Sequence, residues 1–359
     1  MTFLSKKPLK LQYNYPMEKT QLKKLFKNQG IDVIASLSPQ TKRWFAKIDA
    51  SSGYLFIEEK SAHLFVDSRY IEHAKKEAQN VKVNLLTKNS LQDFLKTKNY
   101  KKVAIESEYI TLNQQKQIEK LIPKAKLIEI IAQDLRIIKS EQEISYIKKA
   151  AKISLKAFKK IKKEIKPGIT EKQIDAMLSY ELKMMGAEKN SFEPIVVSGP
   201  RGAMPHGKPS NRKIKPGELV TIDFGCVYNG YCSDITRTFA IDQIINLKLI
   251  DIQKVLKKAQ KLGINAVKPG IKISEVDKIC RDFIASKGYA DNFTHATGHG
   301  LGIDVHELPI VTSNQSQDVV LKPGMVITVE PGIYIEGVGG IRIEDDILVT
   351  KDGYEVLSK

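Results

Sequence analysis

The C-terminal part of the chain repeats itself, and this constrains its fold more than any other feature. The segment IKPGITE at 165–171 recurs 102 residues later as VKPGIKI at 267–273. Each copy leads into an amphipathic stretch that ends at a glycine, Gly186 or Gly288. Two copies at this long spacing are too few for a solenoid, which stacks several short repeats. We therefore expect one domain built from two related halves.

A second pair of segments places acidic residues at equivalent points of the two halves. The sequence IKPGELVTIDFG at 214–225 recurs as LKPGMVITVEPG at 321–332, shifted by 107 residues. Within them, Asp223 and Glu330 each follow an apolar run typical of a buried strand. A charged side chain at such a position is costly unless it is paired or bound to a metal. The duplication thus predicts a site shared between the halves.

The chain before this repeat has a different pattern, so we expect two domains. A length of 359 residues exceeds what one hydrophobic core usually serves. The first part alternates short strands with helices, at 53–57, 63–66, 67–77, 101–105 and 111–121. This pattern predicts an α/β N-terminal domain at 1–135 and an α+β domain with an internal pseudo-twofold repeat at 136–359.

A capping box marks the start of the second domain. Ser140 is followed three residues later by Glu143, and apolar residues then recur at helical spacing. We expect this helix to end at Pro167-Gly168. The domain boundary is therefore placed shortly before Ser140, near residue 135.

Composition argues against several classes of function. The net charge is +17, but the lysines are spread along the chain without a basic tail or a nucleic-acid-binding motif, so we expect no nucleic-acid partner. The apolar stretches are too short to cross a bilayer, so we expect no membrane association. Residues 1–19 lack the apolar core of a signal peptide, and the three cysteines show no CxxC spacing. Both features favour a cytoplasmic protein.

A predicted hairpin brings two aspartates together. Asn229-Gly230 is the strongest short hairpin turn signal, and as a two-residue loop it fixes the register of the flanking strands. Asp223 then faces Thr236. Asp234 faces Gly225, which lies on the same face as Asp223. The two aspartates are diagonal neighbours about 7–8 Å apart at the backbone, within joint reach of a pair of ions unless a bulge shifts the register.

Three of the six histidines fall in one glycine-rich segment. His295, His299 and His306 lie within HATGHGLGIDVH at 295–306. The glycines at alternate positions break any helix, so we expect a close-packed loop.

Two further acids complete a set with the chemistry of a metal centre. Glu330 and Glu344 both belong to apolar strand segments. The candidate ligands are Asp223, Asp234, His299, Glu330 and Glu344. Their four carboxylates need two divalent cations for neutrality. Oxygen-rich ligation with one imidazole suits Mn²⁺, with Co²⁺, Fe²⁺ or Zn²⁺ as alternatives, and a pair of ions can bridge and deprotonate a water nucleophile.

These residues, in this order, resemble the pita-bread metallopeptidases, a family that includes aminopeptidase P, prolidase and methionine aminopeptidase. The resemblance covers Ser140 to the C-terminus, and FVDSRY at 65–70 looks like the creatinase-type N-terminal domain. It implies a creatinase-like N-terminal domain, a pita-bread catalytic domain and a dinuclear metal centre on the five ligands. One departure is RWFAKID at 43–49, which replaces the more usual Tyr-Leu-Thr-Gly-Phe stretch.

The resemblance also implies roles around the metal centre. Glu330 doubles as general base or proton shuttle. His206, in Pro205-His206-Gly207, matches the histidine that binds substrate and assists proton transfer. The implied catalytic residues are His206, His295, His306 and Glu330, and the implied substrate-binding residues are His206, His306 and Arg342.

The expected reaction is hydrolysis of the Xaa–Pro bond at a free N-terminus, as in Xaa-Pro aminopeptidases. A prolidase, which takes only Xaa-Pro dipeptides, uses the same catalytic set, so both activities stay open. A non-catalytic binding protein of the same fold is a third alternative, although such relatives generally lose metal ligands that this chain keeps. Relatives are commonly dimers, so we expect a homodimer whose substrates are peptides with proline in second position.

Overall fold

The computed structural model describes residues 20–244, 246–314 and 318–359. The expectation about a signal peptide concerns residues 1–19 and lies outside the described residues. The chain divides into two units, Met1–Arg136 and Ile137–Lys359, each described here by itself. Within the described ranges, no helix is both long enough and apolar enough to cross a membrane.

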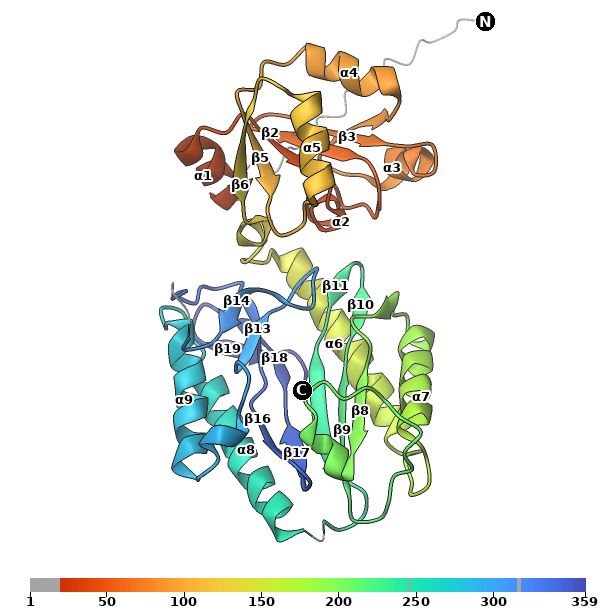
Figure 1. Ribbon diagram of the computed structural model, residues 1–359, viewed down its shortest axis with the longest axis vertical. Helices are drawn as coiled ribbons and strands as arrows, with labels where there is room; N and C mark the ends of the chain where they lie inside the picture. Colours follow the sequence, from red (N-terminus) through yellow and green to blue (C-terminus); the bar gives the residue numbers. More distant parts are fainter. Residues whose placement is uncertain (1–19, 245, 315–317) are drawn as a thin grey trace, which may run out of the picture. The chain divides into compact units, whose positions relative to one another are not determined.

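The N-terminal unit is an α/β unit built on one mixed sheet (Figure 1). Its elements are α1 (Thr20–Gln29), β1 (Val33–Ser36), α2 (Pro39–Thr41), the π-helical turn η1 (Lys42–Ala46), β2 (Tyr54–Glu58), β3 (Ala62–Val66), α3 (Ile71–Glu77), β4 (Lys82–Leu85), α4 (Lys88–Lys96), β5 (Lys102–Glu106), α5 (Leu112–Leu121), β6 (Lys126–Ile130) and the 3₁₀ turn η2 (Ala132–Leu135). The strand order is β4-β3-β2-β1-β5-β6, with β1 antiparallel to β2 and parallel to β5.

One predicted helix of this unit starts later than expected. The sequence suggested a start at Asp67, but α3 begins at Ile71. The Asp67 carboxylate accepts from the backbone N–H of Arg69 at 2.9 Å, and its carbonyl accepts from the N–H of Tyr70 at 3.1 Å. These local bonds form a turn that holds Asp67 outside the helix.

The C-terminal unit, Ile137–Lys359, carries the duplicated segments. Its elements are α6 (Glu141–Ile161), α7 (Glu171–Met184), β7 (Lys189–Asn190), β8 (Ile195–Ser198), η3 (Gly199–Ala203), β9 (Leu219–Phe224), β10 (Cys226–Tyr228), β11 (Tyr231–Cys232), β12 (Ile235–Ala240), α8 (Leu247–Ala266), α9 (Ile273–Ser286), η4 (Ala290–Asn292), β13 (Gly298–Gly300), β14 (Glu307–Val311), β15 (Val326–Val329), β16 (Gly332–Ile335), β17 (Gly339–Arg342), β18 (Asp345–Val349) and β19 (Tyr354–Val356). The two larger sheets have the orders β12-β9-β8 and β14-β13-β15-β18-β19.

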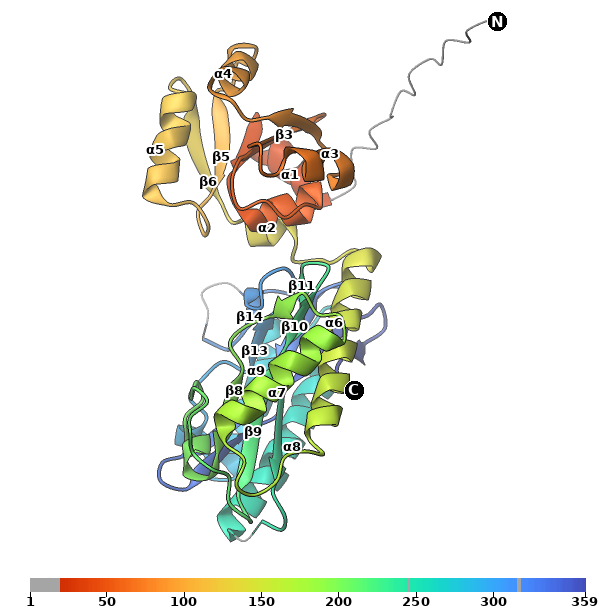
Figure 2. The same ribbon diagram turned by 90° about the vertical axis from the view of Figure 1, so that its right-hand side faces the viewer.

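Helices cover both halves of this unit. In Figure 1, α6 and α7 lie along one side and α8 and α9 along the other, with the strands between them; Figure 2 views the unit from the side of α6 and α7. Ile153 of α6 and Ile174 of α7 share a hydrophobic cluster with Ile222 of β9. In the second half, Val276 of α9 packs against Ile327 of β15. Within each half, the hydrophobic core thus joins helices to strands.

The duplication is visible in the hydrogen bonds of the two halves. The N–H of Gly168 donates to the carbonyl of Ile214 at 2.9 Å, and the N–H of Gly270 donates to that of Leu321 at 3.0 Å. These pairs occupy the equivalent positions of the repeat. In the first half, α6 ends at Ile161 rather than at Pro167-Gly168 as predicted. The chain leaves the helix earlier because it must turn before Gly168 can pair with Ile214.

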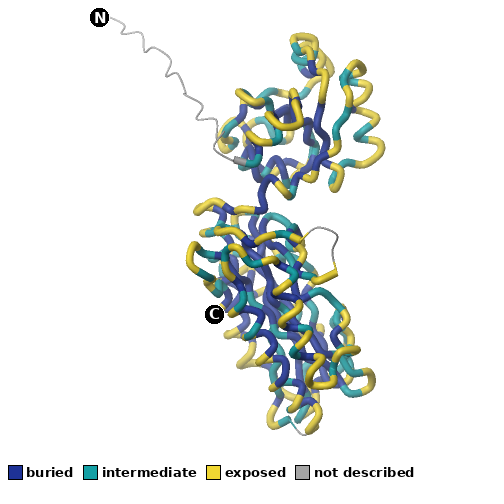
Figure 3. The backbone as a smooth tube through the Cα atoms, turned by 90° about the vertical axis from the view of Figure 1, so that its left-hand side faces the viewer, coloured by how far each residue is buried: buried dark blue, intermediate teal, exposed yellow. Residues whose placement is uncertain are grey.

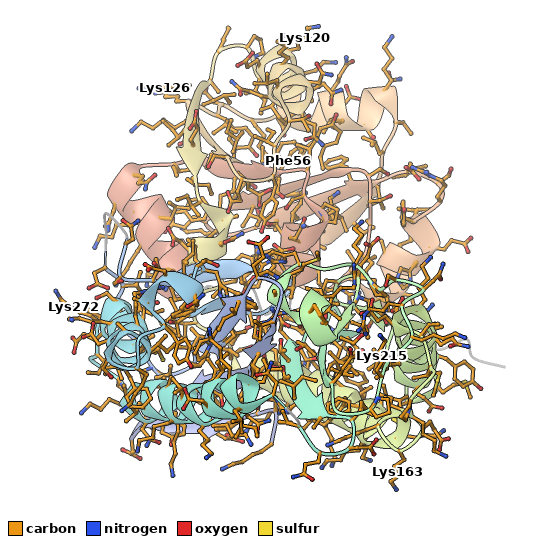
Figure 4. All side chains as sticks on the ribbon, turned by 60° about the horizontal axis from the view of Figure 1, so that its bottom comes forward. Phe56, Lys120, Lys126, Lys163, Lys215 and Lys272 are labelled. Atoms are coloured by element: carbon orange, nitrogen blue, oxygen red, sulfur yellow. The ribbon has the colours of Figure 1, made fainter. Side chains whose placement is uncertain are left out.

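The lysines labelled in Figure 4 lie on the surface of both units. Figure 3 shows buried backbone along the strands and exposed backbone mainly in loops and outer helix faces. In Figure 4, Lys120, Lys126, Lys163 and Lys272 point outward, and these four lysines and Lys215 are exposed. Phe56 is fully buried in the core of the N-terminal unit. The positive charge of these lysines is therefore solvated.

Candidate metal centre

The hairpin predicted from Asn229-Gly230 is formed. Both turn residues have positive φ, 47° and 75°, as a type I′ turn requires. The strands pair Tyr228 with Tyr231 and Asp223 with Thr236, which confirms the register predicted from the turn. Both Asp223 and Asp234 are buried. The turn chemistry thus sets where the two aspartates lie.

His299 lies in a short strand, where the sequence suggested a loop. β13 pairs with both β14 and β15. A Cβ on Gly298 would stand 2.1 Å from the carbonyl oxygen of Thr328, and one on Gly300 would stand 2.2 Å from that of Leu308. Glycine therefore permits a backbone approach that a side chain would prevent. The expected close packing is present, and it places His299 between two neighbouring strands.

The two glutamates stand at strand ends rather than inside strands. Glu330 directly follows β15, and its N–H donates to the carbonyl of Thr297 at 2.7 Å. Glu344 lies between β17 and β18, and its N–H donates to the carbonyl of Thr236 at 3.2 Å. These backbone bonds tie each glutamate to the segment that carries another candidate ligand.

All five candidate ligands meet in one cluster. One ligand atom from each of Asp223, Asp234 and Glu344 lies within 4.8 Å of the others, and the same holds for His299, Glu330 and Glu344. The His299 Nε2 atom is 3.2 Å from Glu330 Oε1 and 3.6 Å from Asp234 Oδ2. Glu344 therefore joins the two groups into a single site.

The donor atoms fit bound cations. Asp223 Oδ1, Asp234 Oδ1 and Glu344 Oε1 are buried and have no hydrogen-bond partner among the described residues. The other oxygens of two of them are fixed, because Asp223 Oδ2 accepts from Arg342 Nη2 and Glu344 Oε2 from Thr236 Oγ1, both at 2.6 Å. An unpartnered buried acceptor costs roughly 1–3 kcal/mol, and more when charged. Divalent cations would satisfy these oxygens.

The imidazole of His299 is oriented for the same purpose. Its Nδ1 lies 3.0 Å from the carbonyl oxygen of Gly300, so Nδ1 carries the proton and donates. Nε2 then points toward Glu330 and Asp234: without a cation it donates to Glu330, and with one it would present its lone pair to the metal. A backbone carbonyl on the far nitrogen is a common way to orient a metal-binding histidine.

The electrostatics show that the carboxylates need a counter-charge. Burial raises the pKa of Asp234 well above its usual range, and the charges of Glu344 and Asp223 raise it further. Burial, followed by the charges of Glu330 and Asp223, does the same to the pKa of Glu344. Burial alone would raise the pKa of Glu330, but its hydrogen bond to His299 lowers it overall. Without cations the cluster cannot hold all four acids ionised.

Three further histidines surround this cluster. His295 places Nδ1 2.7 Å from the carbonyl oxygen of Ala296 and Nε2 2.9 Å from the hydroxyl of Tyr334. His306 is exposed, and its ring centroid is 4.2 Å from that of His299. His206 is exposed in the segment after η3. Burial lowers the pKa of His295 and of His306. His206 directly follows Pro205, whose carbonyl accepts from Arg342 Nη1.

Arg342 connects the cluster to the His206 segment. It is buried, and Nη2 donates to Asp223. Its Nη1 donates to the carbonyl of Pro205 at 3.1 Å and to the Tyr334 hydroxyl at 3.0 Å. The guanidinium therefore links the candidate ligand Asp223 to Pro205, the residue before His206. Through the Tyr334 hydroxyl it also connects to His295.

Comparison with known proteins decides the family. Residues 145–351 match metallopeptidase family M24, and residues 19–138 match the creatinase/prolidase N-terminal domain. The chain belongs to metallopeptidase family M24. This confirms the predicted fold, a creatinase-type N-terminal domain followed by a pita-bread catalytic domain. As an M24 metallopeptidase, the protein is a hydrolase that works with divalent metal ions.

Relatives of this M24 peptidase match over nearly the whole chain. A Mycoplasma genitalium protein named provisionally as an Xaa-Pro aminopeptidase is 42% identical, covering 95% of this chain and 96% of that one. The Xaa-Pro dipeptidase of Pyrococcus horikoshii is 41% identical, covering 93% of this chain and 91% of that one. The structure of an Xaa-Pro dipeptidase from Bacillus anthracis has a TM-score of 0.90 and 39% identity, covering 96% and 97% of the two chains. The X-Pro aminopeptidase of Thermotoga maritima has a TM-score of 0.85 and 35% identity, covering 92% and 96%.

Sequence reasoning missed several residues of the M24 site. Thr328 donates to Glu330 Oε1 at 3.1 Å, and the internal repeat could have found it because it is equivalent to Thr221. Asp346 is fully buried and accepts from the N–H of Asp234 at 3.2 Å; its position in an apolar strand was a usable signal. Tyr334 contacts both Arg342 and His295, but no sequence pattern marks it.

Proposed function

We propose that this M24 metallopeptidase cleaves the bond between the first residue and a proline in second position, at a free N-terminus. The relatives named above as Xaa-Pro aminopeptidases and dipeptidases support this specificity. The observation that carries the chemistry is the cluster of buried carboxylates with three unpartnered oxygens. Such a cluster has no structural use, because it lowers stability until it is filled.

We propose that five residues hold two divalent cations, Mn²⁺ in preference to Co²⁺, Fe²⁺ or Zn²⁺. The ligands are Asp223, Asp234, His299, Glu330 and Glu344. When bound, the cations lower the pKa of a water molecule and polarise the substrate carbonyl.

The protein's own residues then move the proton. Glu330 has a lowered pKa and is held beside His299, so it accepts the proton released as water oxygen bonds to the carbonyl carbon. The C–N bond breaks, and the leaving proline nitrogen must gain one proton. We propose that Glu330 releases this proton again and that His206, which is exposed and follows the Arg342-bound Pro205, relays it to the nitrogen, so that both residues return to their starting protonation states. His295 is catalytic in this proposal, and Tyr334 holds its Nε2.

Substrate recognition is assigned to the residues around that proton path. His206 and His306 are exposed next to the cluster and can reach a bound peptide. Arg342 is predicted to bind substrate as well, and its donors already join Pro205 to Asp223. Its contribution then includes fixing the groups that touch the peptide.

Xaa-Pro dipeptidase activity is the second candidate. The specific observation in its favour is that the Pyrococcus horikoshii relative and the Bacillus anthracis structure are both named Xaa-Pro dipeptidases. The same site serves both reactions, so the two differ only in the length of peptide accepted.

A substrate series separates the two activities. The metal-loaded enzyme is assayed on Xaa-Pro-Yaa tripeptides, Xaa-Pro dipeptides and matched Xaa-Ala-Yaa tripeptides. We expect cleavage of the proline tripeptides and far slower cleavage of the alanine series. Activity on dipeptides alone would establish the prolidase alternative, and equal rates on both tripeptide series would reject proline specificity. Exhaustive chelation should abolish turnover, and Mn²⁺ should restore it.

The remaining proposals concern organisation. We place the N-terminal domain at 1–135 and the catalytic domain at 136–359, supported by the division of contacts after Arg136. We propose a cytoplasmic homodimer. Light scattering should give twice the chain mass of 40.4 kDa, and a value equal to that mass would reject the dimer.

A further inference from the structure

A fully buried carboxylate outside the metal centre gathers both ends of the segment that carries His206. Glu171 is the first residue of α7 and is 0% exposed. Its Oε1 accepts from the N–H and hydroxyl of Ser198, at 2.8 and 2.9 Å. Its Oε2 accepts from the N–H and hydroxyl of Ser210, at 3.0 and 2.6 Å. One side chain therefore joins the two ends of the segment 198–210.

The same carboxylate also holds the middle of the segment. Arg201 Nε donates to Glu171 Oε2 at 3.1 Å, and Arg201 Nη2 donates to the carbonyl of Lys208 at 2.6 Å. On the side of the metal centre, Arg342 donates to the carbonyl of Pro205. The backbone on both sides of His206 is thus fixed, although the His206 side chain is exposed.

Neutral donors supply most of the bonds to Glu171. Four of the five hydrogen bonds named above come from the two serines, and Arg201 supplies the one cationic contact. Burying an acid is costly, and a carboxylate is the side chain that can accept on both oxygens at once. A glutamine of the same shape would turn an N–H₂ group toward donors. The arrangement therefore depends on the charge and the two acceptors together.

The second half of the catalytic unit uses a similar anchor. Asp277 of α9 is also 0% exposed, and its oxygens accept from Thr297 and Ser313. Thr297 lies between His295 and His299. The repeat aligns Asp277 with Asp175 rather than with Glu171, so the two anchors are not sequence equivalents. In each half, a buried acid therefore binds the backbone of a segment that carries a histidine.

We propose that Glu171 is a positioning residue that acts through His206. By clamping segment 198–210, it holds the His206 imidazole where it can deliver a proton to the leaving nitrogen. This proposal rests on the proposed function of His206. A small displacement of a group that transfers a proton lowers kcat strongly, whereas none of the proposed metal ligands lies on segment 198–210.

A double-mutant cycle tests the proposal. Glu171→Gln, His206→Ala and the double variant are assayed for kcat on an Xaa-Pro-Yaa tripeptide, per folded enzyme of measured metal content. We expect Glu171→Gln alone to lower kcat about 10–100-fold, the range typical of supporting residues, with full metal occupancy. In the His206→Ala background it should lower kcat less than about twofold, because the group it positions is gone. Equal losses in both backgrounds would overturn the proposal.

Glu143→Gln is the matched control. Glu143 is a buried acid in the first turn of α6 that accepts from the Tyr231 hydroxyl at 2.8 Å and lies outside the His206 segment. Its loss should lower thermal stability with kcat nearly intact. If Glu171→Gln fails to fold, Ser210→Ala removes one bond of the clamp and should lower kcat in wild type but not in His206→Ala. An enzyme inactive on every Xaa-Pro peptide would instead reject the proposed function, and with it this proposal.

Discussion

The two units of this protein treat buried charges in opposite ways. In the N-terminal unit, Lys42 is fully buried, and its Nζ donates to the carbonyls of Leu37, Ala50 and Ser52 at 3.0, 3.3 and 3.0 Å. Glu106 there accepts from the hydroxyls of Ser36 and Thr41. In the metal centre of the catalytic unit, Asp223, Asp234 and Glu344 each keep one oxygen without a partner among the described residues. A buried charge completed by the protein is structural, and one left incomplete marks a binding site.

This difference has an energetic consequence. Polar groups that are fully bonded add to stability or cost little, whereas unpartnered or crowded ones lower it by several kcal/mol. The stability of the N-terminal cluster should therefore not depend on a ligand. The catalytic cluster should lower stability until cations bind. Each of the following predictions tests one side of this contrast.

The largest expected effect is on activity. Asp234→Asn keeps the shape of the side chain but removes a charge that balances the cations, so metal binding weakens. Cations supply several kcal/mol of transition-state stabilisation, and each 1.4 kcal/mol is tenfold in rate. We expect kcat/KM to fall by on the order of 10³-fold or more, with metal content measured by elemental analysis. Wild-type turnover would remove Asp234 from the site.

The same variant, Asp234→Asn, should be more stable than the wild type in the metal-free form, although it is less active. Without metal, Asp234→Asn should raise the thermal midpoint, because it relieves the crowding of Asp234 with Glu344 and Asp223. Mn²⁺ should stabilise the wild type by about 4 kcal/mol when its free concentration is roughly 1,000 times Kd, and the variant by much less. Differential scanning calorimetry with and without Mn²⁺ measures both effects. If Mn²⁺ left the thermal midpoint of the wild type unchanged, the proposed contrast between the two units would be wrong.

Part of the site could be predicted from the sequence because local chemistry determines it. The Asn229-Gly230 turn fixes the hairpin register, and the repeat pairs Asp223 with Glu330. The strand at His299 could not be predicted, because β13 has three residues, two of them glycines with low strand propensity, and it forms only through pairing with β14 and β15. The contacts of Tyr334 and Glu171 likewise depend on tertiary approach.

The helix ends show the same limit. The capping box at Ser140 and Glu143 predicted the start of α6 correctly, since its bonds are local. The predicted end of α6 at Pro167-Gly168 was wrong, because the long-range hydrogen bond between Gly168 and Ile214 determines where the chain turns. The local capping bonds thus determine the start of α6, whereas tertiary pairing determines where the chain turns after it.

A smaller effect is expected from pH in the N-terminal unit. Burial lowers the pKa of Lys42 from 10.5 to about 8, and the charge of Glu106 opposes this shift. Between these values the unfolded chain binds more protons than the native state, so stability rises with pH. Relative to Lys42→Met, the wild type should gain about 3 kcal/mol from pH 8 to 10.5, at 1.36 kcal/mol per unit. Chemical denaturation across this range measures the difference, and parallel profiles would contradict it.

The smallest expected effect concerns strain beside Lys42. Lys47 ends the π-helical turn η1 at φ 58° and ψ 30°, a left-handed conformation. Among the described residues with positive φ, it alone is neither glycine, asparagine nor aspartate. The conformation costs a side chain of this kind about 1–2 kcal/mol, part of which glycine returns as extra freedom in the unfolded chain. Lys47→Gly should therefore raise the free energy of unfolding by about 0.5–1 kcal/mol and leave kcat/KM and the response to Mn²⁺ unchanged.

Asp242→Gly, at φ 61° in the catalytic unit, is the control and should gain less because aspartate tolerates this region better. A loss of stability in Lys47→Gly would show that contacts of the lysine side chain outweigh the backbone strain.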